Sequence, residues 1–159
     1  MNDSQLLYIP KIRQGIVIDH VPAGLGIQVL TVIRSYPGMK DIVVTLGINY
    51  KSSKLGTKDM LKLKTTELDD EIVNHIALIA PGVSIKRITD YDVDKRFTLQ
   101  VPESIVNKVK CRNPNCITNF ETNLATLFTL VDAEKHKFRC KHCERIFDLQ
   151  ELEFRFVKR

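Results

Sequence analysis

The four cysteines of this chain form two close pairs, and this spacing constrains the fold more than any other feature of the sequence. Cys111 and Cys116 read C-x4-C, and Cys140 and Cys143 read C-x2-C. When two such knuckles face each other, they bring four thiolates into the tetrahedral arrangement that zinc requires, with Zn–S distances of about 2.3 Å. Because four cysteines complete the tetrahedron, we predict one closed, structural zinc site per chain, without the open position that zinc catalysis needs.

Other arrangements of these cysteines are possible in principle. They could form two disulfides, but residues 1–5 lack the basic region and apolar run of a secretory signal, so we expect a cytoplasmic protein with reduced thiols. His136 and His142 lie beside the second cysteine pair and are further candidate ligands. Since four thiolates already fill the coordination sphere, we predict a site made of the cysteines.

Phenylalanines and cysteines are distributed unevenly, which indicates two modules. Phe97 is the one phenylalanine before residue 103, whereas the others and all four cysteines follow it. Pro102 lies near this change, so we predict domains at 1–102 and 103–159. The hydrophobic fraction of 43% is ordinary for a globular protein. No apolar run reaches the roughly 18 residues of a transmembrane helix, so we predict no membrane partner.

The net charge of +5 raises the possibility of a nucleic-acid partner. Four thiolates and one Zn²⁺ would lower this charge by two. Several basic residues also flank the cysteines, where they can neutralise a zinc–thiolate dianion: Lys110, Arg112, Arg139, Lys141 and Arg145. The positive charge is therefore local, and we predict no nucleic-acid partner.

Apolar spacing in the first module predicts alternating strands and helices. The β-branched run Ile16-Val17-Ile18 is typical of a buried strand, and a helical spacing of apolar residues follows it. The predicted order is strand 12–19, helix 25–36, strand 41–48, loop 50–56, strand 58–65, helix 66–79, strand 83–89 and strand 97–101. This β-α-β-β-α-β order with an extra strand predicts an α+β, ferredoxin-like open sheet with helices on one face.

The second predicted helix has a clear start signal and a clear buried face. Thr66 to Asp69 resembles a capping box, and the acidic residues that follow suit the positive end of the helix dipole. Its apolar stripe consists of Leu68, Ile72, Ile76 and Ile79. His75 lies near this stripe, so we interpret it as a packing residue.

The second module is predicted to be small and all-β. Strand-like stretches occur at 105–109, 124–131, 145–147 and 153–156. A module of this size is marginally stable without a staple, and zinc binding provides one.

The strand predicted at 58–65 presents a row of lysines. Its period of two places Lys58, Lys62 and Lys64 on one face, opposite Leu61 and Leu63. Such a row is either a solvated face or a site for an anionic ligand, and the spacing alone does not distinguish the two.

The sequence resembles the regulatory chain of aspartate carbamoyltransferase over essentially its whole length. The resemblance is carried by the cysteine quartet and by four segments in matching order, which are 15–23 (GIVIDHVPA), 56–59 (GTKD), 80–81 (AP) and 87–91 (RITDY). In that family the first module binds nucleotide effectors, and the zinc module docks on the catalytic chain. Two catalytic trimers are bridged by three regulatory dimers, and the regulatory chain itself has no activity.

The resemblance implies a non-catalytic subunit that binds CTP, ATP and UTP and controls pyrimidine biosynthesis. It implies that Asp19 accepts from ribose, that His20 faces phosphate, and that lysines supply charge. The implied nucleotide-binding residues are Lys11, Ile12, Val17, Asp19, His20, Lys58, Lys62, Lys86, Ile88, Tyr91, Val93, Lys95 and Arg96, of which Lys86 replaces a shorter amide. The implied contacts with the catalytic chain are Asn113, Asn115, Lys141 and Glu144, although turn chemistry alone also explains the two asparagines.

Two other functions compete with this reading. A zinc-ribbon nucleic-acid binder would need exposed aromatic residues interleaved with basic ones, whereas most aromatic residues of the second module alternate as core positions do. A small-molecule enzyme would need a Ser-His-Asp or Cys-His constellation with activating partners, and the sequence shows none.

Overall fold

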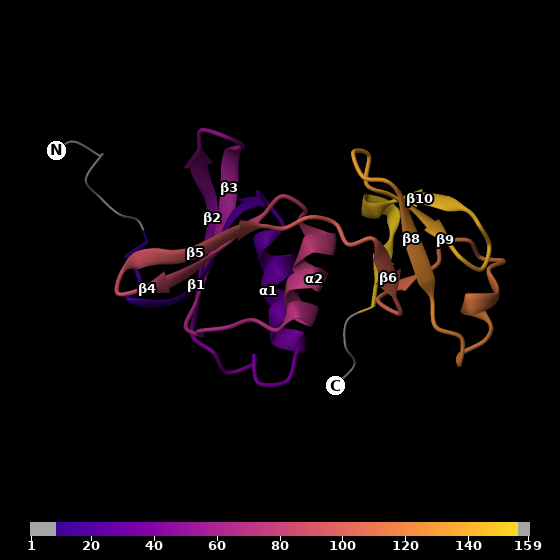
Figure 1. Cartoon of the computed structure of the whole chain (residues 1–159), viewed down its shortest axis with the longest axis horizontal. Helices are drawn as coiled ribbons and strands as arrows, with labels where there is room; N and C mark the ends of the chain where they lie inside the picture. Colours follow the sequence, from indigo (N-terminus) through magenta and orange to yellow (C-terminus); the bar gives the residue numbers. More distant parts are fainter. Residues whose placement is uncertain (1–8, 156–159) are drawn as a thin grey trace.

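The first half of the chain forms one antiparallel sheet with two helices. The structure is a computed structural model that describes residues 9–155. The elements of this half are β1 (Gln14–Pro22), α1 (Gly26–Ser35), β2 (Val44–Ser52), β3 (Gly56–Leu63), α2 (Asp70–Ile79), β4 (Ser84–Thr89) and β5 (Asp92–Thr98). The strand order β2-β3-β1-β4-β5 is that of a ferredoxin-like sheet with one added strand, as predicted. Figure 1 shows α1 and α2 side by side next to this sheet.

Alternation along the strands separates a buried face from an open one. Ile16 and Ile18 of β1 point toward the helices and are at most 5% exposed, as are Leu61 and Leu63 of β3. They pack against the apolar stripes of both helices, including the predicted residue Ile76. Each such side chain contributes about 1.5–3 kcal/mol on full burial, so this layer is the main source of stability in the first half.

Two bulges lie on either side of β3 and bring distant segments together. The pairing of β1 with β3 shifts between Ile18 and Val21, and that of β2 with β3 shifts between Gly47 and Tyr50. Each bulge contains a residue in the left-handed region, His20 with φ 62° and Asn49 with φ 60°. Bulges re-aim side chains, and the first one sets the direction of Asp19 and His20.

Asp59 of β3 forms hydrogen bonds with the start of α1 and with the bulge of β2. Its carboxylate is buried and accepts from the backbone N–H groups of Gly24 and Gly26 at 2.9 Å and of Asn49 at 3.0 Å. A Cβ at Gly26 would lie 2.9 Å from this carboxylate, so a larger residue cannot fit there. The cap residue Leu25 makes no side-chain hydrogen bond, and Asp59 instead places negative charge at the start of α1.

Three local predictions about the first half are wrong. The Thr66–Asp69 capping box is absent, because α2 begins at Asp70 and Thr65 donates to the carbonyl of Glu67. The loop predicted at 50–56 is shorter, because β2 continues to Ser52 and β3 begins at Gly56. The added strand lies at 92–98 and not at 97–101, since it pairs with β4 across a turn at 90–91.

The second half forms two small sheets around its own core. Its elements are β6 (Ser104–Val106), β7 (Val109–Lys110), η2 (Ile117–Asn119), β8 (Leu127–Asp132), β9 (Lys137–Cys140), β10 (Ile146–Asp148), η3 (Leu149–Glu151) and β11 (Glu153–Phe154), where η marks a 3-10 turn. The sheets have the orders β10-β9-β8-β6 and β11-β7. Phe128 and Phe138 are fully buried between them, whereas Phe120 is 69% exposed. The predicted all-β module is thus confirmed, although β9 was not anticipated.

The two halves contact each other through Tyr36 and α2 on one side, and through Lys108, between β6 and β7, and β11 on the other. Lys108 Nζ lies 2.6 Å from a carboxylate oxygen of Glu71 and 3.4 Å from the hydroxyl of Tyr36. The His75 and Phe154 rings lie 6.1 Å apart, and Leu78 of α2 packs into the second core. Beside this contact lies a cavity of about 660 Å³, lined by residues of both halves. The halves therefore share packed side chains in addition to the connecting chain.

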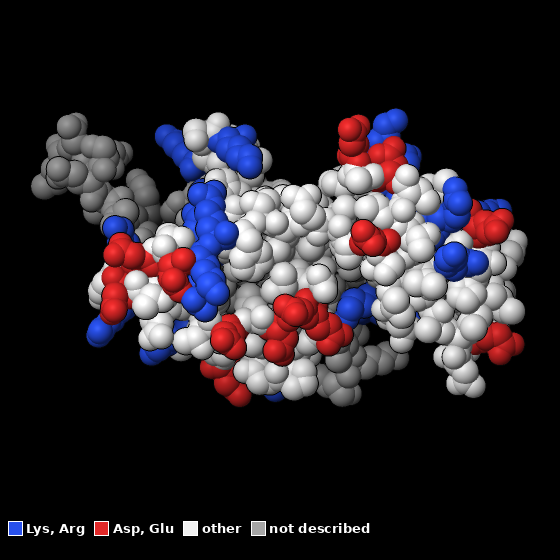
Figure 2. Space-filling model, in the orientation of Figure 1, with Lys and Arg blue, Asp and Glu red and all other residues white. Residues whose placement is uncertain are grey.

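Surface charge is not evenly spread over the described residues. On the face shown in Figure 2, Lys and Arg side chains gather in a column on the first half. The second half carries acidic and basic side chains interspersed on the same face. None of the helices among the described residues has the length and hydropathy needed to cross a bilayer.

Candidate functional sites

The four cysteines come together from four separate positions in the second half. Cys111 follows β7, Cys116 precedes η2, Cys140 ends β9, and Cys143 lies in the turn before β10. All four sulfur atoms lie within 4.8 Å of one another. Cys111 Sγ is 3.7 Å from Cys143 Sγ, and Cys116 Sγ is 3.9 Å from Cys140 Sγ. Tetrahedral Zn–S bonds of about 2.3 Å place sulfurs about 3.8 Å apart, so the cluster fits one zinc ion.

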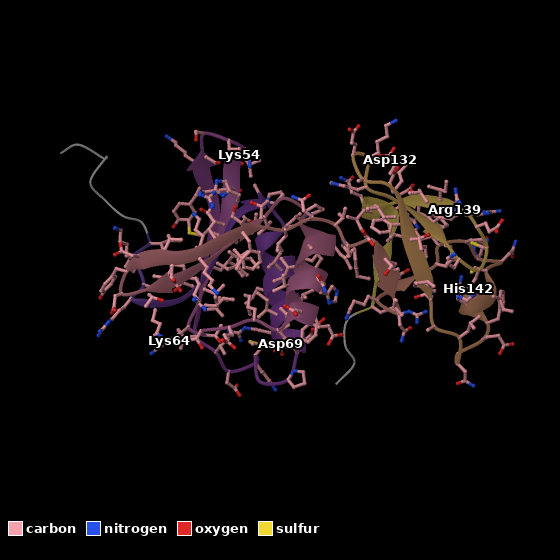
Figure 3. The ribbon with its side chains drawn as sticks, in the orientation of Figure 1. Lys54, Lys64, Asp69, Asp132, Arg139 and His142 are labelled. Carbon is pink, nitrogen blue, oxygen red and sulfur yellow. The ribbon has the colours of Figure 1, made fainter. Side chains whose placement is uncertain are left out.

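The same distances exclude the alternative of two disulfides. A disulfide needs sulfurs about 2.05 Å apart, and all four cysteines are free. His142 Nε2 lies 3.0 Å from the carbonyl oxygen of Ala125, which is not part of the cluster. Among the described residues the candidate metal ligands group as the four cysteines alone. Figure 3 labels Arg139 and His142 on this half of the chain.

Backbone geometry around the cluster is fixed by short-range hydrogen bonds. Asn119 Nδ2 donates to the carbonyls of Cys111 and Asn113 at 3.0 and 2.8 Å. In the second knuckle, Glu144 has φ 59° and its N–H donates to the carbonyl of Cys140 at 2.9 Å. These contacts hold both knuckles in the geometry that a tetrahedral metal needs.

Thiol acidity differs across the cluster. Burial raises the pKa of Cys111 and of Cys140 above the usual thiol range. Burial also acts against ionisation of Cys143, but hydrogen bonds from Asn113 and Arg145 outweigh it and lower its pKa to about 7. A divalent cation supplies the charge that holds all four as thiolates, which is the chemistry of a structural zinc site.

A second candidate site lies on the face of the large sheet that the helices leave open. Strand register places Lys62, Val17 and Lys86 directly opposite one another on β3, β1 and β4, with Arg96 of β5 next in the row. Residues directly opposite each other point to the same face. The lysines predicted on β3 therefore share this face with basic residues of two other strands, Lys86 on β4 and Arg96 on β5.

Asp19 is the acidic centre of this face. It is 5% exposed, and its Oδ1 lies 2.7 Å from Lys58 Nζ and accepts from the backbone N–H of His20 at 2.7 Å. Its Oδ2 lies 2.7 Å from Lys86 Nζ. Burial alone would raise the pKa of Asp19, but the two lysines and the His20 N–H outweigh burial and hold it far below its usual range. The carboxylate is therefore ionised at any physiological pH.

His20 and Lys62 complete the neighbourhood of Asp19. Burial lowers the pKa of His20, opposed by Asp19 and supported by nearby lysines, so the imidazole is neutral at pH 7. Its Nδ1 atom is buried and has no hydrogen-bond partner within the described residues. Lys62 Nζ donates to the carbonyl of Pro10 at 2.6 Å, which places Pro10 next to this lysine.

The remaining candidate nucleotide residues surround this centre less closely. Ile12 and Lys62 line a cavity of about 380 Å³, and Ile88 is buried beside Gly15 on β1. Tyr91 donates its N–H to the carbonyl of Arg13 at 3.0 Å. Five candidates have exposed side chains with no contact to Asp19 among those described: Lys11, Tyr91, Val93, Lys95 and Arg96.

The four candidate docking residues differ in exposure. Asn115, Lys141 and Glu144 are exposed beside the cysteine cluster. Asn113 is 6% exposed, and its side-chain oxygen accepts from the N–H of Asn115 at 3.2 Å. Asn113 is thus a turn residue of the knuckle, in line with the turn-chemistry alternative.

Sequence reasoning missed Asp59 and Lys108. Both act on segments far away in the chain, through partners such as Gly26 and Glu71. The sequence offers one indication for Asp59, which is that it lies inside the 56–59 segment that carries the family resemblance.

Comparison with known proteins finds a match for each half of the chain. A family model described as the allosteric domain of the aspartate carbamoyltransferase regulatory chain matches residues 7–100, and the metal binding domain of the same chain matches residues 103–153. The chain belongs to this family. It is a regulatory, non-catalytic chain whose partner is the catalytic chain of aspartate carbamoyltransferase, an enzyme of pyrimidine biosynthesis.

Similar regulatory chains come from several archaea. That of Pyrococcus abyssi is 40% identical over 146 residues, which cover 92% of this chain and 95% of the relative. That of Pyrobaculum islandicum is 41% identical over 150 residues, covering 94% and 99%. That of Nitrosopumilus maritimus is 32% identical over 154 residues, covering 97% and 99%. The resemblance thus extends over both halves of the regulatory chain.

Proposed function

We propose that this regulatory chain binds nucleoside triphosphates on the open face of its large sheet and so controls the catalytic chain. CTP, ATP and UTP are the proposed effectors. The observation that carries the proposal is the arrangement of three lysines, Lys58, Lys62 and Lys86, around the single carboxylate of Asp19. Such a site has surplus positive charge for phosphates and an ionised acceptor for ribose hydroxyls.

The surrounding residues support a nucleotide in particular. The buried, unpartnered Nδ1 of His20 lies beside Asp19, where a ligand can supply its missing partner. The cavity at Ile12 offers an apolar wall and nearby backbone groups that could read a base. Lys95 and Arg96 remain the proposed contacts at the phosphate end.

We place the domain boundary at Pro102, with the nucleotide-binding domain at 1–102 and the zinc domain at 103–159. Asn115, Lys141 and Glu144 are the proposed contacts with the catalytic chain, and Asn113 contributes by shaping the knuckle.

We also propose that the regulatory chain forms a homodimer and that it is located in the cytoplasm. The exposed apolar residues Val43 and Ile48, on and beside the edge strand β2, support such a dimer. We propose no nucleic-acid or membrane partner.

Calorimetry on Lys62→Ala tests the nucleotide site. Losing a charge-assisted hydrogen bond costs about 1.5–3 kcal/mol, so CTP and ATP should bind about ten- to a hundredfold more weakly. Cytidine and adenosine should lose less, because they carry no phosphate. Lys40→Ala, an exposed lysine after α1, is the matched control and should bind as the parent does. An equal loss for nucleoside and triphosphate would show that Lys62 does not contact phosphate.

A further inference from the structure

The carboxylate of Asp19 accepts three hydrogen bonds from groups of the chain itself. A carboxylate offers about four acceptor positions. Lys58 and the N–H of His20 use two on Oδ1, and Lys86 uses one on Oδ2. His20 Nδ1 lies 3.6 Å from Oδ2, too far for a hydrogen bond. One acceptor position therefore remains free, and it belongs to the oxygen that Lys86 holds.

A ribose cannot donate both of its adjacent hydroxyls to Asp19 without displacing a lysine. Its two adjacent hydroxyls would donate two hydrogen bonds, and Asp19 has room for one. Lys86 is the lysine whose departure opens the second position on the same oxygen, because Lys58 is bound to the other. Departure of Lys86 leaves Asp19 paired with Lys58, so the buried carboxylate stays compensated.

The register of the sheet gives Lys86 an alternative partner. Lys86 lies between Val17 on β1 and Arg96 on β5 in the row of residues that pair across the strands. Lys62 on β3 is the neighbour of Val17 on the other side. A phosphate held on this open face lies within reach of a lysine stem anchored in the middle of the row. Three lysines to one carboxylate also leave two positive charges that an anionic ligand can neutralise.

We propose that Lys86 exchanges Asp19 for a ligand phosphate, and that this exchange makes the site select phosphorylated nucleotides over nucleosides. A nucleoside has to displace Lys86 and offers it no anion in return. A nucleotide displaces Lys86 and binds it. Lys86 is thus a specificity-determining residue, and the inference rests on the nucleotide site proposed above.

Affinity ratios for cytidine, CMP and CTP test this inference in the full-length chain. In Lys86→Met, CTP should bind at least tenfold more weakly, whereas cytidine should bind as well as to the parent or better. The preference for CTP over cytidine should therefore fall by tenfold or more, and CMP shows whether one phosphate suffices. Lys86→Arg keeps the cation and should retain most of the preference, while Lys40→Met should match the parent.

NMR of the lysine Nζ groups in the parent chain tests the exchange without any substitution. The Lys86 Nζ signal, assigned with Lys86→Arg, should shift when CTP is added and shift much less with cytidine at equal saturation. Equal losses for CTP and cytidine in Lys86→Met, or a Lys86 signal that does not respond to CTP, would overturn the inference. A parent chain that binds CTP while Lys86→Met keeps the full preference refutes the role of Lys86 alone. A parent chain that binds neither CTP nor ATP refutes the nucleotide site itself.

Discussion

At the scale of single residues, His75 is the clearest case of a titratable group held neutral by packing. Its ring is fully buried between the halves, with Nδ1 3.0 Å from the hydroxyl of Tyr36 and the ring 6.1 Å from that of Phe154. Burial, supported by the charge of Lys108, lowers its pKa to about 4. The interpretation of His75 as a packing residue is consistent with these contacts.

This pKa shift predicts a pH dependence of stability. The unfolded chain binds a proton at His75 below pH 6.5, whereas the folded chain does not until about pH 4, so stability falls as pH falls through this window. Between pH 7 and pH 5 the loss should be about 2 kcal/mol. Urea unfolding should show this loss in the parent and in the exposed control His142→Gln, and a smaller one in His75→Leu. Identical pH slopes in all three proteins would contradict the assignment.

At the scale of secondary-structure elements, apolar periodicity predicted those elements whose buried face is continuous. The strand at Ile16-Val17-Ile18 and the helix carrying Ile76 were found in this way because one side of each packs on the core. β5 was misplaced because all its residues are exposed, so it carries no alternation. β9 was missed because it is four residues long with only two buried positions. In both cases strand pairing decides the structure, and pairing is not a local property of the sequence.

The candidate sites also divide into parts that short sequence motifs predict and parts that depend on strand pairing. The cysteine spacing predicted the metal centre because its ligands lie in two short motifs. The link between Asp19 and Lys86 depends on the register of β1 against β4, and the link between Asp59 and Asn49 depends on the bulge of β2 against β3. Register and bulges are set by the whole sheet, so sequence reasoning alone could not place these contacts.

The zinc module provides the prediction at this scale. Its core holds Cys111, Cys116 and Cys140 next to the phenylalanines, so loss of metal leaves thiols without their cation inside a small core. Cys140→Ser should release zinc and unfold the described part of the second half, residues 104–155. It should abolish binding to the catalytic chain and leave nucleotide binding largely intact. Metal analysis, circular dichroism and sedimentation with the catalytic chain provide the readouts, and a variant that still docks normally would refute this role of the metal.

At the scale of the whole molecule, the proposed effector site and the proposed docking surface lie on different halves. An allosteric effect requires that the effector bind two global states with different affinities, and that the halves move together between them. Pro102 restricts the connecting chain, and the ion pair of Lys108 with Glu71 adds a contact across the halves. We therefore expect a stiff junction.

A short Gly-Ser linker inserted after Pro102 tests this stiffness. Nucleotide affinity and assembly with the catalytic chain should survive, because each depends on one half. The effect of nucleotide on catalytic activity should fall toward zero, because a flexible junction does not transmit a difference between states. If the linker variant responds as the parent does, the signal travels by a route other than this junction.

Reconstitution with the catalytic trimer of the same organism tests the central claim most directly. The regulatory chain alone should show no carbamoyltransferase activity, and the isolated trimer should be active and indifferent to nucleotides. The assembled complex should change its activity when CTP or ATP is added, and this response should be lost in a complex built with Lys62→Ala at nucleotide concentrations that saturate the parent. A complex that assembles but responds to none of CTP, ATP and UTP would contradict the account.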